Sequence, residues 1–238
     1  MAVENENKLN EIIQAFADAG FINDVILIGS WCLSFYVEVF EGFVPSVRTT
    51  DIDFYVPDSK RANAADLSER LKSINYDHFQ DSMTNKSRFV SPEGFEVEFL
   101  AKLNREGLSC VRLGSSGIFA ESLSYVELFG SNYIEVERNG IVVKVASPSA
   151  FAIQKILIND RRGNKAEKDS QAIDYVLSFI NASTKSCAEF YELFDKLPRK
   201  WRKTIEEYCR LRGINLPRRV SNLSKSLTDD CYPDLFLN

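Results

Sequence analysis

The sequence predicts an α/β (α+β) fold in which a mixed β-sheet with flanking helices is followed by a helical C-terminal part. Polar and apolar residues alternate over residues 51–56 and 95–100, as they do in strands with one buried face. Apolar residues three and four positions apart recur between residues 151 and 211, which indicates helices. The composition, 45% hydrophobic and 26% charged, is that of a globular chain.

The length of the chain allows one large domain or two small ones, since it has 238 residues and domains average about 150. Ser147-Pro148-Ser149 is a favourable helix start, because proline is tolerated in the first turn of a helix. We therefore expect a boundary here, with a sheet-bearing domain over residues 1–147 and a helical domain over residues 148–238.

The N-terminal elements are expected to be a helix, a strand and a second helix. Apolar residues recur at helical spacing over residues 9–16, and Gly20 follows as a stop. Residues 25–28 form a short apolar run typical of a strand buried on both faces. The run ends at Gly29-Ser30, after which residues 31–40 are expected to form a helix.

The middle of the chain adds strands to this plan. The alternating strand over residues 51–56 stops at Pro57, a short helix is expected over residues 67–74, and the second alternating strand covers residues 95–100. Asn139-Gly140 is a strong hairpin signal, because these residues tolerate the positive φ of a type I′ turn. We expect it to join strands over residues 133–137 and 141–145. Helices are then expected over residues 151–159, 166–180, 187–194 and 201–211.

Several classes of protein are excluded. No segment approaches about 18 uninterrupted apolar residues and the N-terminus is acidic and polar, so we expect no membrane span, no signal peptide and a cytoplasmic protein. The five cysteines are scattered and form no Cys-x-x-Cys, so we expect no disulfide partner and no zinc site. The single histidine, His78, excludes a histidine triad for zinc, and we expect an ordinary strand or surface histidine.

Charge is distributed unevenly along the chain. Lys and Arg number 29 against 34 Asp and Glu, a net charge of −5, which speaks against non-specific nucleic-acid binding. Between residues 155 and 225, however, 16 Lys and Arg stand against 9 Asp and Glu, a net charge of +7. Two interpretations stay open: ordinary solvated helix surfaces, or an anion-binding lobe that faces an acidic, metal-binding one.

Pairs of carboxylates occur on both alternating strands. Side chains two apart on a strand share a face, so Asp51 and Asp53 stand side by side, as do Glu96 and Glu98. Adjacent carboxylates disfavour each other's ionisation, and a bridging divalent cation relieves this. If the two strands are neighbours, a glutamate supplies the third oxygen ligand of a Mg²⁺ site. An Asp-x-Asp is also common on solvated strand faces, which is the alternative interpretation.

The context of these carboxylates favours nucleotide chemistry. Gly29-Ser30 closes a strand and opens the expected helix, a place where backbone N–H groups can hold a phosphate. The polymerase-β-type nucleotidyltransferase signature, a Gly-Ser followed by Asp-x-Asp and a later acidic strand residue, resembles three segments of this chain: Ile28-Gly29-Ser30, Arg48-Thr49-Thr50-Asp51-Ile52-Asp53-Phe54 and Val97-Glu98-Phe99.

A second set of residues extends the resemblance into the helical part, so that it covers residues 9–181. Residues 147–157, Arg161-Arg162 and residues 165–172 are similar to a helical segment of uncharacterised bacterial nucleotidyltransferases related to the toxins of abortive-infection systems. The chain departs from the pattern in two respects. The stretch over residues 40–47 is additional, so the gap between Gly-Ser and Asp-x-Asp is longer than in minimal members, and the third carboxylate is Glu rather than the commoner Asp.

The resemblance implies an activity and a site. Residues 1–147 would be the catalytic domain and residues 148–238 would complete the nucleotide site. The reaction would transfer a nucleoside monophosphate from an NTP to an acceptor hydroxyl and release pyrophosphate, with Mg²⁺, or Mn²⁺, as cofactor. Asp51, Asp53 and Glu98 would bind the metal, and Glu98 would help to deprotonate the acceptor. The substrate-binding residues would be Gly29, Ser30, Arg48, Lys155, Arg162, Lys165 and Lys168.

Other functions stay open at this point. A metal-dependent glycosyltransferase also uses an Asp-x-Asp, and a catalytically silent nucleotide-binding module, such as one half of a toxin–antitoxin pair, would keep the fold. The acceptor is open among RNA, a protein side chain and a small molecule, and a phage-defence role is compatible with each. Trp201 within a run of basic residues would suit RNA, because an aromatic ring among cations can stack on a base.

Overall fold

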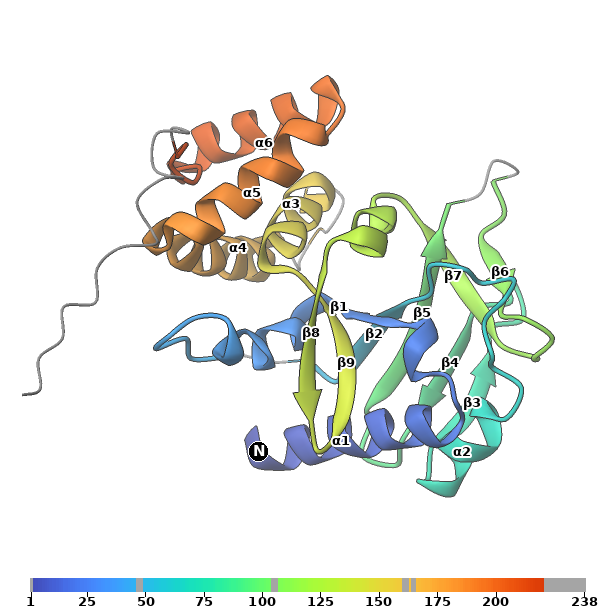
Figure 1. Ribbon diagram of the computed structural model, residues 1–238. Coiled ribbons are helices and arrows are strands. Elements are labelled where there is room, and N and C mark those ends of the chain that lie inside the picture. The colour runs from blue at the N-terminus through green and yellow to red at the C-terminus, as the bar shows by residue number, and fades with distance from the viewer. Residues whose placement is uncertain (1, 46–48, 104–106, 160–162, 164–165, 221–238) are drawn as a thin grey trace, which may run out of the picture.

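The computed structural model describes residues 2–45, 49–103, 107–159, 163 and 166–220. Figure 1 shows the sheet in the centre of the molecule, with helices α1 (Ala2–Asp18) and α2 (Leu67–Ser73) packed together on one side. The later helices gather on the other side of the strands in this view. The predicted fold class, a mixed sheet with flanking helices followed by a helical part, is confirmed.

The sheet is mixed, and within the described residues it has nine strands. Its order is β3-β4-β5-β2-β1-β9-β8, with β7 added to β5 and β6 added to β7. β1 pairs antiparallel with β2 and parallel with β9, while β2 pairs parallel with β5. The strands are β1 (Ile26–Ile28), β2 (Asp51–Tyr55), β3 (Asp77–Gln80), β4 (Ser87–Val90), β5 (Glu96–Lys102), β6 (Cys110–Arg112), β7 (Phe119–Leu123), β8 (Tyr133–Arg138) and β9 (Ile141–Ala146).

Part of the hydrophobic core lies between α1 and the sheet, and the same cluster of buried residues continues into the later helices. Phe16 of α1 is fully buried, and its ring centroid lies 4.7 Å from that of Phe54 on β2 and 5.8 Å from that of Phe99 on β5. Asp51 and Asp53 of β2 alternate with buried residues and stay partly exposed. The strand alternation predicted from the sequence is therefore confirmed, and it directs the carboxylates away from the core.

Strand β5 changes its partner along one edge. Residues 96–98 pair antiparallel with β4, whereas residues 100–102 pair in parallel with β7. The fully buried Ser87 joins the two partners, because its hydroxyl oxygen accepts the backbone N–H of Phe119 at 3.0 Å. The start of β4 is thus fixed beside the start of β7, next to the middle of β5.

The hairpin and the start of the helical part follow the sequence signals. Asn139 and Gly140 have φ values of +54° and +78°, so both residues of the turn between β8 and β9 need the positive φ that this dipeptide tolerates. The hydroxyl oxygen of Ser147 accepts the N–H of Ala150 at 3.3 Å and caps a helix with Pro148 in its first turn. The helices are α3 (Pro148–Ile158), α4 (Ala166–Ala182), α5 (Thr184–Lys196) and α6 (Arg199–Arg212).

The expectation of an α-helix over residues 31–40 is wrong. The segment forms two short 3₁₀ helices, η2 (Gly29–Ser34) and η3 (Tyr36–Glu38). Aromatic and β-branched residues crowd this segment and lose side-chain freedom in an α-helix, so packing decides its conformation. The apolar spacing still indicated burial correctly, since Trp31 and Tyr36 are at most 1% exposed.

Four strands escaped sequence-based prediction, namely β3, β4, β6 and β7. They are three to five residues long, and every residue of β3 is exposed, so they carry little apolar alternation. The short 3₁₀ helix η4 (Val126–Ser131) was likewise not predicted. His78 lies in β3, where its ring stacks on Phe89 at 4.6 Å between centroids, and the partial burial of the ring lowers its pKa.

Two expectations about the protein's environment can be compared with the described residues. Among them, we find no helix that is both long enough and apolar enough to cross a membrane. Cys32, Cys187 and Cys209 are buried and Cys110 is partly exposed, and all four have free thiols. Cys231 lies outside the described residues.

An aromatic cluster connects the segment after η3 to the helical part. It consists of Phe40, Phe43, Tyr175 and Phe179. The centroid of the Phe43 ring lies 4.9 Å from that of Tyr175 and 5.0 Å from that of Phe179, both on α4. The backbone N–H of Val44 donates to the Tyr175 hydroxyl oxygen at 3.0 Å. Residues 40–44 are therefore packed against α4.

Replacement of Phe43 by alanine is expected to lower the free energy of unfolding by about 3–5 kcal/mol, the usual cost of emptying a buried phenylalanine site. Urea unfolding followed by circular dichroism measures this change. Val44→Ala is the matched control: this side chain is 69% exposed, so a change within about 0.5 kcal/mol is expected. Equal effects of the two substitutions would show that the cluster does not hold the segment.

Candidate active site

The carboxylates of β2 and β5 stand in register. The two strands pair in parallel, with Asp51 opposite Glu96 and Asp53 opposite Glu98. A cavity of about 460 Å³ opens beside them, and Asp51, Asp53 and Glu98 line it. The neighbouring-strand arrangement that a shared metal site requires is present.

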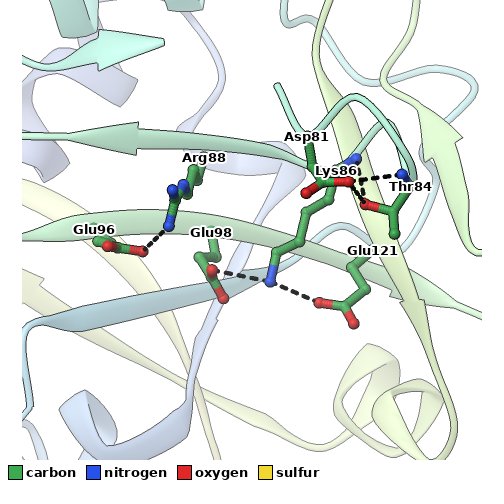
Figure 2. A network of polar contacts seen from close by, with 7 residues as sticks. All are labelled: Asp81, Thr84, Lys86, Arg88, Glu96, Glu98 and Glu121. Atoms are coloured by element: carbon green, nitrogen blue, oxygen red, sulfur yellow. Dashed lines mark hydrogen bonds and ion pairs between the residues drawn. The ribbon is translucent and has the colours of Figure 1, made fainter. Parts of the chain in front are cut away.

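The two glutamates of β5 differ in their surroundings. Glu98 lines the cavity, and its side chain is 19% exposed. The carboxylate of Glu96 instead lies 3.4 Å from the guanidinium of Arg88 on β4. Figure 2 shows the two glutamates with separate cationic partners along the strand. The position of Glu98 is the one compatible with a shared site with the aspartates.

Gly29 permits the close approach of the Asp53 carboxylate. It directly follows β1 and has a φ of +71°, and a Cβ atom at this position would lie 2.5 Å from Oδ2 of Asp53. A side chain here would displace that carboxylate, so the glycine is required by both space and backbone conformation. Gly29 opens the six-residue 3₁₀ helix η2 instead of the α-helix expected, and the role of Gly29-Ser30 in phosphate binding stays a prediction.

Lys155 reaches the cavity wall already bound to a carboxylate. Its Nζ lies 2.7 Å from Oδ1 of Asp169, which joins α3 to α4. The side chains are 5% and 4% exposed, so water screens the pair little. Lys168 also lines the cavity and is exposed. Gly29 and Ser30 line it as well, whereas Arg48, Arg162 and Lys165 lie outside the described residues.

Two charged residues of the cavity were missed by the sequence analysis. Lys86 precedes β4, and its Nζ lies 2.9 Å from Oε1 of Glu98 and 2.7 Å from Oε2 of Glu121 on β7 (Figure 2). Burial lowers the pKa of Lys86, but the hydrogen bonds and charges of Glu121 and Glu98 outweigh it, so the pKa is raised overall. No local signal in the sequence indicates either residue, because residues 119–123 show no polar–apolar alternation and Lys86 precedes its strand.

The donor atoms fit a hard divalent cation only in part. Carboxylate oxygens are the ligands that Mg²⁺ prefers, and Asp51 and Asp53 present them from one face of β2. Glu98 is engaged by Lys86. Among the described residues, no three His, Cys, Asp or Glu side chains are grouped closely enough to hold a metal as they stand. The aspartates fit the metal, and Glu98 must reorient to complete the set.

Adjacent strands that present carboxylates to one cavity can hold a divalent cation, and phosphoryl- and nucleotidyl-transferring enzymes use such cations. A family of nucleotidyltransferases matches residues 7–192, and the chain belongs to this family. Membership excludes the glycosyltransferase alternative. It does not separate the toxin-related branch from the rest, so that closer resemblance stays a prediction. No curated protein matches the sequence.

Solved structures of nucleotidyltransferases resemble the chain at low identity. An antigenic nucleotidyltransferase-like protein from Paracoccidioides brasiliensis is 17% identical, with a TM-score of 0.44 over 82% of this chain and 92% of that one. The antibiotic-resistance factor ANT(2″)-Ia is 12% identical, with a TM-score of 0.45 over 90% and 95%. The structure of ANT(2″)-Ia in complex with adenylyl-2″-tobramycin is 11% identical, with a TM-score of 0.48 over 87% of this chain and 97% of that one.

Breaking the buried ion pair is expected to destabilise the protein. Asp169→Asn leaves the Lys155 ammonium buried without a countercharge, which costs about 3–5 kcal/mol of unfolding free energy. The double replacement Lys155→Met with Asp169→Leu removes both charges and is expected to restore most of that stability. Urea unfolding measures both variants.

The control for this prediction is an exposed ion pair of similar length. Nζ of Lys196 lies 3.0 Å from Glu192, with side chains 70% and 72% exposed. Lys196→Met is expected to change stability by less than about 0.5 kcal/mol. If Asp169→Asn is equally mild, Lys155 does not depend on this carboxylate and is available to a ligand.

Proposed function

We propose that the protein transfers a nucleoside monophosphate from an NTP to an acceptor hydroxyl, with release of pyrophosphate and with Mg²⁺ as cofactor. The observation that carries the proposal is the register of β2 and β5, which brings Asp51, Asp53 and Glu98 to one cavity in a chain of the nucleotidyltransferase family. Mn²⁺ has the same preference for oxygen ligands and would substitute.

In the proposed reaction each residue has a chemical role. The acceptor oxygen attacks the α-phosphorus, the bond from that phosphorus to the bridging oxygen breaks, and the electron pair leaves with pyrophosphate. The hydroxyl proton passes to Glu98. Asp51, Asp53 and Glu98 would hold the divalent cation, which when bound would neutralise charge on the triphosphate and lower the pKa of the acceptor hydroxyl.

The helical part is proposed to complete the nucleotide site, with residues 1–147 and 148–238 as two domains. Lys168 is the cation that we assign to the triphosphate, because it lines the cavity from α4 and is exposed. Lys155 acts differently in this proposal. Its charge is balanced by Asp169, so it shapes the cavity wall rather than binding phosphate. Arg48, Arg162 and Lys165 remain predicted phosphate ligands.

The acceptor is RNA, a protein side chain or a small molecule, and labelling distinguishes these classes. The protein would be incubated with each α-labelled NTP, Mg²⁺, total RNA and cell extract, and the labelled fraction identifies the acceptor. Trp201, the candidate stacking residue for RNA, packs edge-on against Tyr125 with 4.8 Å between ring centroids. This contact favours a packing role for Trp201 over base stacking.

NTP with Mg²⁺ is expected to stabilise the fold. A ligand at about one hundred times its Kd adds about 2.7 kcal/mol, which for a chain of this size raises Tm by about 5–10 °C. Differential scanning fluorimetry with each of the four NTPs measures the shift, with nucleotide sugars as the comparison. The absence of any shift with NTPs would contradict nucleotide binding.

Asp53→Asn is expected to abolish transfer and to leave the fold intact or slightly more stable. The substitution removes one of two adjacent like charges in the metal-free protein, while the metal loses a ligand. Glu96→Gln is the control, because Glu96 stands opposite Asp51 but pairs with Arg88. Transfer of α-label is measured for both. An Asp53→Asn variant with more than about a tenth of wild-type transfer, a barrier increase under about 1.4 kcal/mol, would refute the assignment.

A further inference from the structure

The position of Lys86 between two carboxylates points to a role in metal binding. We propose that Lys86 holds Glu98 while the site is free of metal, and that the ammonium withdraws to Glu121 when the metal recruits Glu98. Glu121 is then a positioning residue, since it acts through Lys86. The inference rests on the proposed function, because it assigns the metal to Asp51, Asp53 and Glu98.

The fold fixes Lys86 in this place from two directions. The carbonyl of Lys86 accepts the backbone N–H of Asp81 at 2.9 Å, which closes the turn between β3 and β4. The next residue, Ser87, is fully buried and ties the start of β4 to Phe119 of β7. Because β5 changes its partner from β4 to β7 at this level, the Lys86 side chain lies between Glu98 and Glu121 (Figure 2).

The two ion pairs of Lys86 are equivalent enough for an exchange. The Nζ atom lies 2.9 Å from Glu98 and 2.7 Å from Glu121, so the ammonium already contacts both carboxylates. When it loses Glu98, its ion pair with Glu121 is already formed. The side chains of Lys86, Glu98 and Glu121 are 25%, 19% and 35% exposed, so water screens these charges only partly. When Glu98 binds the metal instead of Lys86, the ammonium would keep Glu121 as its carboxylate partner and would not be an unpaired charge in the cavity.

Competition follows from the charges of the groups involved. Glu98 carries one negative charge, and a divalent ion and an ammonium on the same carboxylate repel each other at short range. The metal must therefore displace Lys86 from Glu98, and the free energy of that displacement lowers the metal affinity. Glu121 reduces this penalty because it neutralises the displaced ammonium. Lys86 and Glu121 are thus expected to affect metal binding in opposite directions.

The test measures metal binding by the full-length protein in the absence of nucleotide, by calorimetric titration with Mg²⁺ and by the electron paramagnetic resonance of free Mn²⁺. Lys86→Met is expected to tighten binding about fivefold or more, because Glu98 loses its competitor. Glu121→Gln is expected to weaken binding by a similar factor, because the displaced ammonium has no partner. Thermal unfolding of each variant checks that it is folded.

A double-mutant cycle separates this role from a plain effect of charge. If Glu121 acts through Lys86, Glu121→Gln has no further effect in the Lys86→Met background, and the double variant binds metal like Lys86→Met. If Glu121 merely adds negative potential, the two effects add. Additive effects would therefore overturn the proposal. Weaker metal binding by Lys86→Met would also overturn it, because that result is expected if Lys86 only holds Glu98 in the position that binds the metal.

The neighbouring ion pair on the same two strands provides matched controls. Arg88 and Glu96 are 3.4 Å apart, and neither lines the cavity. Arg88→Met removes one positive charge and Glu96→Gln removes one negative charge, each two residues along the chain from Lys86 or Glu98. Both variants are expected to leave the metal affinity within about twofold of wild type. Shifts equal to those of Lys86→Met and Glu121→Gln would overturn the specific role of Lys86.

The proposal and the function on which it rests fail in different ways. Wild-type protein that binds no metal without nucleotide, or binds it as well after Asp53→Asn, would overturn the exchange, whereas the proposed function is overturned only if Asp53→Asn also retains nucleotidyl transfer. Metal binding that depends on Asp53 but ignores Lys86 and Glu121 would overturn the exchange alone and leave the proposed reaction in place.

Discussion

Repulsion between like charges is the constraint on which the site depends. The parallel pairing of β2 with β5 places Asp53 beside Glu98, and strand geometry keeps Asp51 on the same face, so carboxylates gather where water is limited. Each needs a compensating cation. The protein supplies Lys86 to Glu98 and Glu121, and Lys155 to Asp169, from elements outside β2 and β5. The surrounding fold is organised to deliver these ammonium groups.

The features predicted from the sequence are those with a local physical signal. Alternation revealed β2 and β5 because each has one buried face, and Asn139-Gly140 revealed the hairpin because its φ values are unusual. The arrangement around Lys86 has no such signal. It depends on β5 changing partner between two short strands, and on contacts between Lys86 and residues 12 and 35 positions away along the chain. Non-local pairing of this kind leaves no periodic trace in the sequence.

The lysines near the cavity show why residue type alone does not assign a role. Lys155 and Lys168 are equivalent in sequence terms, since both lie on predicted helices of the basic segment. Burial separates them: Lys155 is enclosed with Asp169 between α3 and α4, whereas Lys168 is exposed. A buried ammonium must be paired, because an unpaired charge in the interior is costly. Its countercharge, on the following helix, therefore decides what the lysine can do.

Gly29 has a consequence for the divergence of related chains. A Cβ atom at this position would overlap the carboxylate of Asp53, so the steric demand on residue 29 lasts only while Asp53 is present. The two positions are expected to vary together. A relative that lost the aspartate would be released from that overlap, and residues that tolerate a φ of +71°, such as asparagine, would then be accepted. A side chain at position 29 is thus expected only in relatives that have lost this carboxylate, whereas a glycine there is compatible with either case.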